Sequence, residues 1–132
     1  MKKFLTISLL CSLAGCVSSP PAPAGPATPV FFQSFSAALD KSALTAIAAA
    51  ANAASQQPDA QVTVIGAADS VGSVLANKYL SETRAQVVAD ALVSDGVSAD
   101  RIHIHGVGIA SAPGAAGTPE QSARRVLIQL DQ

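Results

Sequence analysis

The sequence predicts an α/β two-layer sandwich in the order β-α-β-α-β-β, with a mixed sheet and two helices on one face. Two observations lead to this fold class. Two stretches carry helical signals, and they alternate with short runs rich in β-branched and apolar residues. Two helices that each follow a strand imply right-handed crossovers, which place both helices over the same sheet.

The first strand and the first helix are predicted in the N-terminal half. Val30-Phe31-Phe32 is a short apolar run and predicts the first strand. Residues 40–57 predict a helix, because Asp40 or Ser42 can cap its N-terminus and Pro58 ends it. The face expected to be buried carries Leu44, Ile47, Ala48 and Ala51.

The second strand and the second helix follow. Residues 61–65 are rich in β-branched side chains and predict a strand that Gly66 closes. From Ser81, as N-cap, good helix formers predict a helix that ends just before Gly96. Its apolar residues at helical spacing are Ala85, Val88, Ala89 and Leu92.

Two strands are predicted in the last third of the chain. Residues 101–105 alternate in polarity, and so do residues 125–130, where Val126, Ile128 and Leu130 share one side. Between them, residues 106–118 are Gly, Ala, Ser and Pro with almost no charge, which predicts a loop.

The N-terminus has the pattern of an export signal. Lys2 and Lys3 precede an apolar run that is too short to span a bilayer, so residues 1–15 are expected to be a signal peptide. The segment Leu13-Ala14-Gly15-Cys16 resembles the lipobox of bacterial lipoproteins, which implies lipidation at Cys16. The alternative is an ordinary signal peptide followed by an incidental cysteine.

Residues 16–29 and 30–132 differ in composition. The first stretch holds the lipidated cysteine and a Pro/Ala-rich tether with polyproline character, and the second is one small domain. Without Lys2 and Lys3, six of the eight basic residues remain against nine acidic ones, a net charge of −3. This balance argues against nucleic acid as a partner.

One acid and one base are expected to lie together. Asp69 sits just beyond a strand end, where α/β folds bind ligands. Arg84 is expected in the first turn of the second helix, where a cation opposes the helix dipole, so helix stability alone does not explain it. An arginine fork beside free helix N–H groups favours an anion, and the pair therefore suits a zwitterion.

Several motifs resemble the OmpA-like domain family, which includes the peptidoglycan-associated lipoproteins. They span most of residues 30–130 and occur in the family's order: Val30-Phe31-Phe32, Val64-Ile65-Gly66-x-Ala68-Asp69-x-x-Gly72-Ser73, Asn77-x-x-Leu80-Ser81-x-x-Arg84-Ala85, Gly96-Val97-x-x-x-Arg101-Ile102 and Arg124-Arg125-Val126-x-Ile128.

The resemblance implies a ligand and its binding residues. The family's ligand is the diaminopimelate side chain of the peptidoglycan stem peptide, whose far end carries an ammonium and a carboxylate. The resemblance puts the ammonium on Asp69 and the carboxylate on Arg84, with Asn77 and Arg124 as weaker candidates. It implies a non-enzymatic wall tether without a cofactor, lipid-anchored to the outer membrane with its domain in the periplasm. Val17 supports the outer membrane, because it is not the Asp that retains many lipoproteins on the inner membrane.

The chain departs from the family pattern at five supporting positions. The family usually has an acid, His, Tyr, Glu and Asn, respectively, where this chain has Gln33, Ala67, Ala76, Ile109 and Ala123. A binding pair works only when its neighbours hold it in place. A domain of this family that binds other envelope proteins instead of the wall is therefore the first alternative.

Other chemistries have weaker support in the sequence. His103 and His105 share one strand face, but no third metal ligand is evident, so no metal site is expected. Ser70 and Ser111 lack the context of a catalytic nucleophile. Asp69 and Glu82 could act as acid and base on a glycan, although Glu82 is better explained as a favourable charge in the first helical turn. No enzyme is predicted.

Overall fold

The computed structural model describes residues 26–110 and 116–131, so the predicted signal peptide, Cys16 and Ser111 lie outside the described residues. Its elements follow one another as β1 (Thr28–Phe31), α1 (Lys41–Ser55), β2 (Gln61–Ala68), α2 (Val74–Ser94), the 3-10 turn η1 (Ala99–Arg101), β3 (Ile102–Ile109) and β4 (Arg125–Asp131). This confirms the predicted order.

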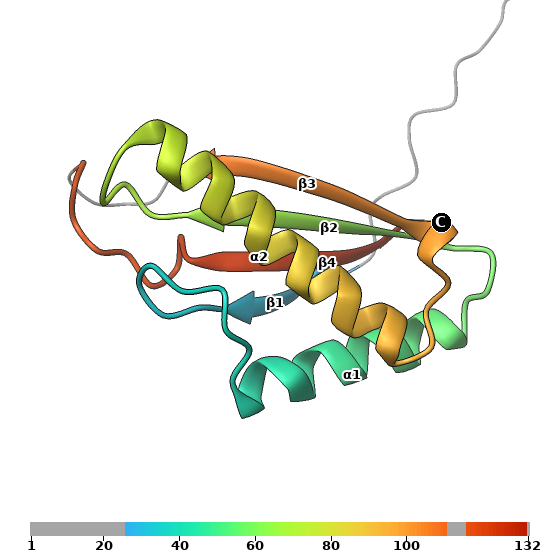
Figure 1. The fold of residues 1–132 in the computed structure, drawn as a ribbon. Helices are drawn as coiled ribbons and strands as arrows, with labels where there is room; N and C mark the ends of the chain where they lie inside the picture. The colour runs from blue at the N-terminus through green and yellow to red at the C-terminus, as the bar shows by residue number, and fades with distance from the viewer. Residues whose placement is uncertain (1–25, 111–115, 132) are drawn as a thin grey trace, which may run out of the picture.

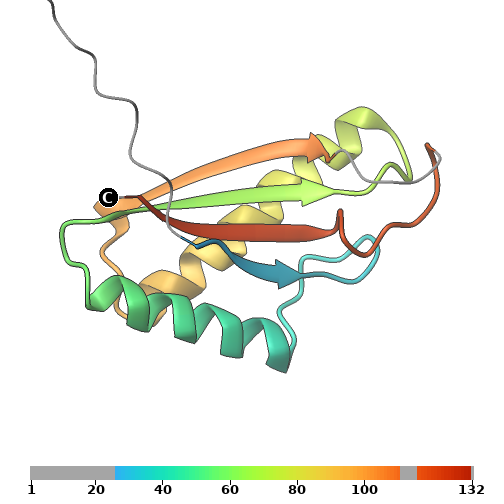
Figure 2. The same ribbon diagram turned by 180° about the vertical axis from the view of Figure 1, so that it is seen from behind.

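The four strands form one mixed sheet in the order β1-β4-β2-β3. β4 is antiparallel to both of its neighbours, whereas β2 and β3 are parallel and are connected through α2. Figure 1 shows both helices in front of the sheet, and Figure 2, from behind, shows a sheet face that carries neither helix. The predicted two-layer sandwich is therefore confirmed.

The core fills the space between the sheet and the two helices. Val126, Ile128 and Leu130 of β4 are buried in the predicted alternation, and Val62 and Val64 lie beside them on β2. The predicted apolar face of α2 is also buried. Its side chains pack against the sheet, together with those of α1.

The first strand begins two residues earlier than predicted. Thr28 pairs with Ile128 and Pro29 with Leu127, so the end of the predicted tether belongs to the sheet. A proline is acceptable here because β1 is an edge strand and needs no second set of ladder hydrogen bonds.

α1 has the predicted cap but buries a different face. Asp40 Oδ1 accepts a hydrogen bond from the Ala43 N–H at 2.7 Å. The prediction that Leu44 and Ala48 are buried is wrong, because both are exposed, Leu44 by 50%. The buried residues are Ala43, Ile47, Ala50, Ala51 and Ala54. The helix is so rich in alanine that its polarity pattern hardly distinguishes one face from another.

α2 starts two turns before the predicted position. Its N-cap is Ser73, which accepts a hydrogen bond from the Ala76 N–H, and Ser81 lies inside the helix. The predicted end is correct. Gly96 has φ +99° and its N–H donates to the Val93 carbonyl, while the Val97 N–H donates to the Leu92 carbonyl.

Gly66 and Gly106 lie inside strands, which corrects their assignment to a strand end and a loop. β2 continues to Ala68 and β3 to Ile109. A Cβ on Gly66 would lie 2.0 Å from the Ser81 carbonyl oxygen, and one on Gly106 would lie 2.7 Å from the Glu82 nitrogen. These glycines allow α2 to approach the sheet closely. No helix within residues 26–110 and 116–131 is both long and apolar enough to span a membrane.

Candidate functional site

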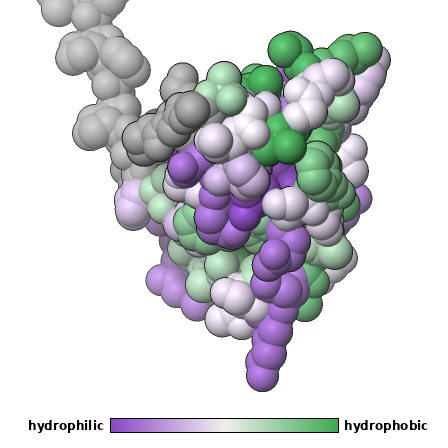
Figure 3. All heavy atoms as spheres, turned by 90° about the vertical axis from the view of Figure 1, so that its left-hand side faces the viewer, coloured by the Kyte–Doolittle hydropathy of each residue, from purple (hydrophilic) through white to green (hydrophobic). Residues whose placement is uncertain are grey.

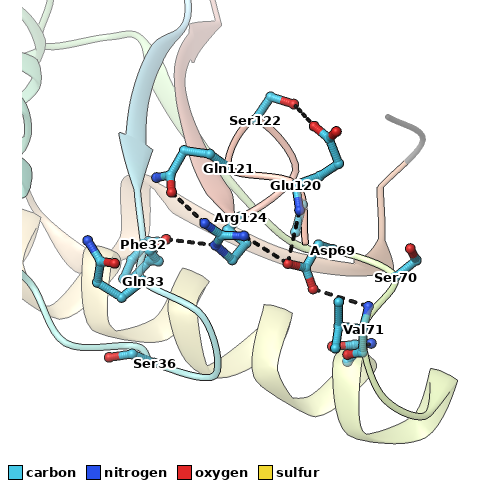
Figure 4. Close-up of polar contacts among 12 residues, drawn as sticks. Phe32, Gln33, Ser36, Asp69, Ser70, Val71, Glu120, Gln121, Ser122 and Arg124 are labelled. Carbon is cyan, nitrogen blue, oxygen red and sulfur yellow. Dashed lines mark hydrogen bonds and ion pairs between the residues drawn. The ribbon is translucent and has the colours of Figure 1, made fainter. Parts of the chain in front are cut away.

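Asp69 follows the end of β2, as predicted, and its side chain is held from three directions. Its Oδ2 accepts hydrogen bonds from Arg124 Nη1 at 3.0 Å and from the Glu120 N–H at 3.3 Å, and Oδ1 accepts one from the Val71 N–H at 3.2 Å (Figure 4). Asp69 is only 6% exposed. The carboxylate is therefore fixed before any ligand arrives.

The surroundings of Asp69 favour its ionised form. Burial by itself would raise the pKa of the carboxyl, but the hydrogen bonds from Arg124, Val71 and Glu120 and the charge of Arg124 outweigh burial and hold the pKa below its ordinary value. Asp69 therefore keeps its negative charge near neutral pH and is unsuited to act as a general acid.

Arg84 lies near the middle of α2, because the helix begins at Val74, so the argument from the helix N-terminus is wrong for this residue. Its side chain is nevertheless directed at the site end of the sheet. The guanidinium donates to three main-chain carbonyls, those of Ser36 at 2.8 Å, Gln33 at 2.9 Å and Ala67 at 3.0 Å. It also lies 5.2 Å from the ring centroid of Phe32.

Arg84 is a fully buried cation with 1% exposure. Burial lowers the pKa of its guanidinium, the charge of Asp69 raises it, and the charge of Arg124 lowers it again. An arginine remains protonated under such conditions. Asp69, Arg84 and Arg124 thus form one electrostatic group.

Arg124 is more central than its sequence context indicated. Besides Asp69, it bonds the Phe32 carbonyl through Nε at 3.2 Å and the Gln121 side chain through Nη2. It is 8% exposed. The neighbouring Arg125 donates to the Ser122 carbonyl in an exposed position, so the two adjacent arginines differ in their surroundings.

Asn77 is buried and supports the loop after β2. Its Nδ2 donates to the Val71 carbonyl at 3.0 Å, and Val71 in turn binds Asp69. On the other side of the carboxylate, the Gly117 N–H donates to Ser70 Oγ at 2.8 Å. Residues 69–71 and residues 117–120 therefore hold each other across the site.

The three ionised side chains sum to a charge of +1 in a largely buried cluster, which suits an anion or a zwitterion better than a cation. Figure 3 looks at this end of the molecule, where hydrophilic residues gather in the middle and hydrophobic ones along the upper right. Val74 and Leu75, in the first turn of α2, are 74% and 63% exposed.

The two histidines and Glu82, which the sequence raised for other chemistries, lie outside the charged cluster. His103 and His105 are exposed on β3, and His103 Nε2 lies 3.1 Å from Gln61 Oε1. Within residues 26–110 and 116–131, no group of three or more His, Cys, Asp or Glu residues is placed to hold a metal ion. Glu82 is not in a first helical turn, and it pairs with Lys78 at 3.2 Å.

Comparison with known protein families identifies the family of this chain. The sequence profile of the OmpA family matches residues 31–126. The chain belongs to the OmpA family.

Two curated proteins illustrate what this chain is similar to. The chain is 39% identical over 103 residues to the probable lipoprotein YiaD of Escherichia coli, a match that covers 76% of this chain and 47% of YiaD. It is 40% identical over 73 residues to the peptidoglycan-binding protein ArfA of Mycobacterium tuberculosis, covering 55% of this chain and 22% of ArfA. The chain thus spans about half of the first relative and a smaller part of the second.

Solved structures of OmpA-like domains have the same fold. The peptidoglycan-associated lipoprotein of Burkholderia pseudomallei superposes with a TM-score of 0.69 at 24% identity, covering 77% of this chain and 89% of that one. The OmpA-like domain of FopA1 from Francisella tularensis gives a TM-score of 0.67 at 29% identity, covering 78% and 70%.

The resemblance implies other residues at Gln33, Ala67, Ala76, Ile109 and Ala123, and these five positions differ in their surroundings. Gln33 and Ala67 contribute only main-chain carbonyls to Arg84. Ala123 is fully buried beside Arg124, whereas Ala76 and Ile109 are solvent-accessible. The scaffold of the charged cluster therefore consists largely of main-chain groups.

Sequence reasoning missed these main-chain partners and the pairing of Asp69 with Arg124. No sequence pattern marks a carbonyl as an acceptor, because every residue has one. The pairing follows from register: Gly66 lies opposite Val126 in an antiparallel ladder, which brings the residues after β2 close to those before β4. This register becomes available only once the strands are known to be neighbours.

Proposed function

We propose that this chain is a lipid-anchored envelope protein that binds peptidoglycan non-covalently and tethers the outer membrane to the cell wall. One observation carries the proposal. A buried carboxylate and two buried guanidinium groups meet at the carboxyl end of β2 in a member of the OmpA family. A relative of this chain is named a peptidoglycan-binding protein, which supports the wall as ligand.

The ligand that fits this cluster is the far end of diaminopimelate, which carries an ammonium and a carboxylate. Asp69 Oδ1 accepts one hydrogen bond within the described part of the chain and has a lone pair left for the ammonium. Arg84 donates three of its five N–H groups to the carbonyls described above, which leaves two for the carboxylate. Arg124 and Asn77 hold the carboxylate of Asp69 and its loop in place.

The proposed membrane anchor is Cys16, which lies outside the described residues. Lipidation with two or more acyl chains would anchor the protein durably, whereas one chain binds a membrane only marginally. A tethered domain experiences a high effective concentration of wall peptides, so a modest affinity suffices for function. Val17 after the cysteine supports the outer membrane as its location.

A second candidate function is an interaction module that binds other envelope proteins and not the wall. The ion pair between Asp69 and Arg124 favours it, because a ligand ammonium must share a carboxylate that is already neutralised. The side chains of Ala67 and Ala76, which replace polar family residues, add no hydrogen bond to a ligand.

Sedimentation with purified peptidoglycan sacculi separates the two candidates. The full chain, in mild detergent, should pellet with sacculi and be released by free meso-diaminopimelate. Asp69→Asn should remain in the supernatant, because it keeps the shape of the side chain and loses its charge. Asp59→Asn is the matched control, since Asp59 is exposed and precedes β2 at the opposite end of the sheet.

The outcomes have distinct meanings. If the wild type failed to pellet, the interaction module would be the better hypothesis. If Asp69→Asn pelleted like the wild type, the wall would be a ligand but the site would be elsewhere. Incubation with labelled wall fragments should yield no cleavage products, because the low pKa of Asp69 removes the proton that glycan hydrolysis requires.

A further inference from the structure

A groove lies between the C-terminal half of α2 and the start of β3, far from Asp69. β2 and β3 are parallel, so the start of β3 lies at the opposite end of the sheet from the end of β2. The groove has a volume of about 110 Å³ and is lined by Gln86, Ala89, Asp90, Val93, Ala99, Ile102 and Ile104. A water molecule occupies about 30 Å³ in the liquid. The groove therefore has the volume of several water molecules, which is enough for one branched aliphatic side chain.

The walls of this groove are apolar and accessible. Val93 on α2 is 44% exposed and Ile104 on β3 is 39% exposed, and they lie on opposite sides of it. Single exposed aliphatic residues are common on protein surfaces, but two that face one hollow provide a place to bury a further aliphatic side chain.

The groove runs beside the open edge of the sheet. β3 is an edge strand of the sheet, and β2 is its one neighbour within the described residues. The Gly106 carbonyl accepts a hydrogen bond from Lys78 Nζ of α2, and we infer from this contact that it faces the open edge of β3. Because successive residues of a strand alternate in direction, the N–H and C=O groups of Ile104 also face the open edge.

The two halves of the β3 edge differ in whether side chains of α2 bind their main-chain groups. Toward its end, the Gly106 carbonyl and the Gly108 N–H are capped by Lys78 and Ser81 of α2. Among the described residues, no side chain caps the main chain of Ile104. The part of the edge that remains available is the part beside the groove.

The charge around the groove is negative. Asp90 lies on its rim, and Asp95 and Asp100 lie in the turns that flank it. The last turn of α2 has no basic residue, and Arg101 is directed away, toward the carbonyls of Gln57 and Ala60. A cationic neighbour is therefore favoured at this position.

We propose that the edge of β3 and this groove bind an extended peptide segment of another envelope protein. The segment adds a strand beside β3 through the main-chain groups of Ile104 and places an aliphatic side chain between Val93 and Ile104. A lysine or arginine next to that aliphatic residue meets Asp90. Main-chain hydrogen bonds then provide affinity, and the groove and the carboxylate provide specificity.

Selection from a random-peptide phage library on the full chain tests this proposal. Enriched peptides should carry an aliphatic residue next to Lys or Arg, and synthetic copies should shift the amide resonance of Ile104. Val93→Lys and Asp90→Lys should each weaken their binding at least tenfold. Ser94→Lys is the matched control, because Ser94 is exposed on the same turn, does not line the groove, and receives the same charge.

The proposal is overturned if no peptide is enriched on the wild type, if the enriched peptides are acidic, or if Val93→Lys, shown to be folded by circular dichroism, binds them as well as the wild type does. Sedimentation with sacculi should be the same for Val93→Lys and the wild type, because the groove and Asp69 lie at opposite ends of the sheet. This readout keeps a failure of peptide binding distinct from a failure of wall binding.

Discussion

Arg84 serves the fold as well as the proposed site. Its three carbonyl partners belong to the segment between β1 and α1 and to the end of β2, so one side chain holds together parts of the chain far apart in sequence. The expected place of Arg84 in the first turn of the second helix is wrong, and its role as a ligand-binding residue stays a prediction. The unusual position of this cation is explained by buried carbonyls.

Arg84→Ala should destabilise the domain by about 3–5 kcal/mol, because it leaves buried acceptors without donors and removes a large buried side chain. Urea unfolding measures the loss. Arg125→Ala is the matched control and should cost at most about 1 kcal/mol, since Arg125 bonds one carbonyl in an exposed position. Equal stability of the two variants would contradict the structural role, and it would also make Arg84→Ala a usable binding variant.

Asp69 should stabilise the fold in a pH-dependent way. Its pKa is lower in the folded protein than in the unfolded chain, where it is about 3.9. The folded state therefore binds the proton more weakly, and the stabilisation is complete above about pH 4 and is lost as the pH falls through the folded pKa.

Asp69→Asn should thus cost about 3 kcal/mol at pH 7, since it leaves the buried Arg124 without its anion. Urea unfolding of wild type and variant from pH 7 down to about pH 2 should show this difference shrinking below about pH 4. A difference that stayed constant over that range would mean that the carboxylate contributes no charge-dependent stability.

At the scale of elements, the sequence predicted the features that depend only on residues close together in the chain. Asp40 as cap, Gly96 after the helix and the alternation in β4 are local signals, and the structure confirms all three. The start of α2 was missed because Ser73 and Ser81 are both possible caps. Val74, Leu75 and Tyr79 are exposed, so the first turns of the helix lack a buried apolar stripe.

Gly66 and Gly106 show the limit of local reasoning. A glycine at the end of a β-branched run is most simply interpreted as a strand end, since glycine weakens strands. Here the glycines lie under α2, and contact between a helix and a strand distant in sequence cannot be read from the run itself.

Gly66→Ala should therefore destabilise the fold by more than about 3 kcal/mol, because the added methyl group meets the main chain of Ser81 and α2 must move away from the sheet. Gly96→Ala provides the control. No heavy atom lies within 4 Å of its added Cβ, so only the positive φ opposes it, at a cost of about 1 kcal/mol. Thermal unfolding of both variants measures the contrast, and a smaller loss for Gly66→Ala would refute the close-packing role.

At the scale of the whole molecule, the strand directions separate two ends. β1 is antiparallel to β4 and β4 is antiparallel to β2, so β1 and β2 begin at the same end of the sheet. Thr28, the first residue of β1, lies at that end, whereas Asp69 lies at the other end. Because β1 begins at Thr28, the proposed tether is shortened to the eleven residues 17–27, which would reach roughly 34 Å if they were fully extended.

This polarity suits a protein that joins two surfaces, and it can be tested by moving the anchor. With Cys16 replaced by Ser, the mature chain can be coupled to maleimide lipid in vesicles through one new cysteine. Ser55→Cys places the anchor at the end of α1, where β2 begins, and Leu75→Cys places it beside the proposed site.

Vesicles that carry the Ser55→Cys chain should pellet with sacculi, because the site then faces away from the bilayer. Vesicles that carry the Leu75→Cys chain should stay in suspension, although the same chain in detergent should still pellet, since Asp69 and both arginines are unchanged. The Ser55→Cys vesicles control for coupling and lipid composition. If both kinds of vesicle pelleted equally, the orientation of the domain between membrane and wall would not matter. If the Leu75→Cys chain failed to pellet even in detergent, Leu75 itself would belong to the binding surface.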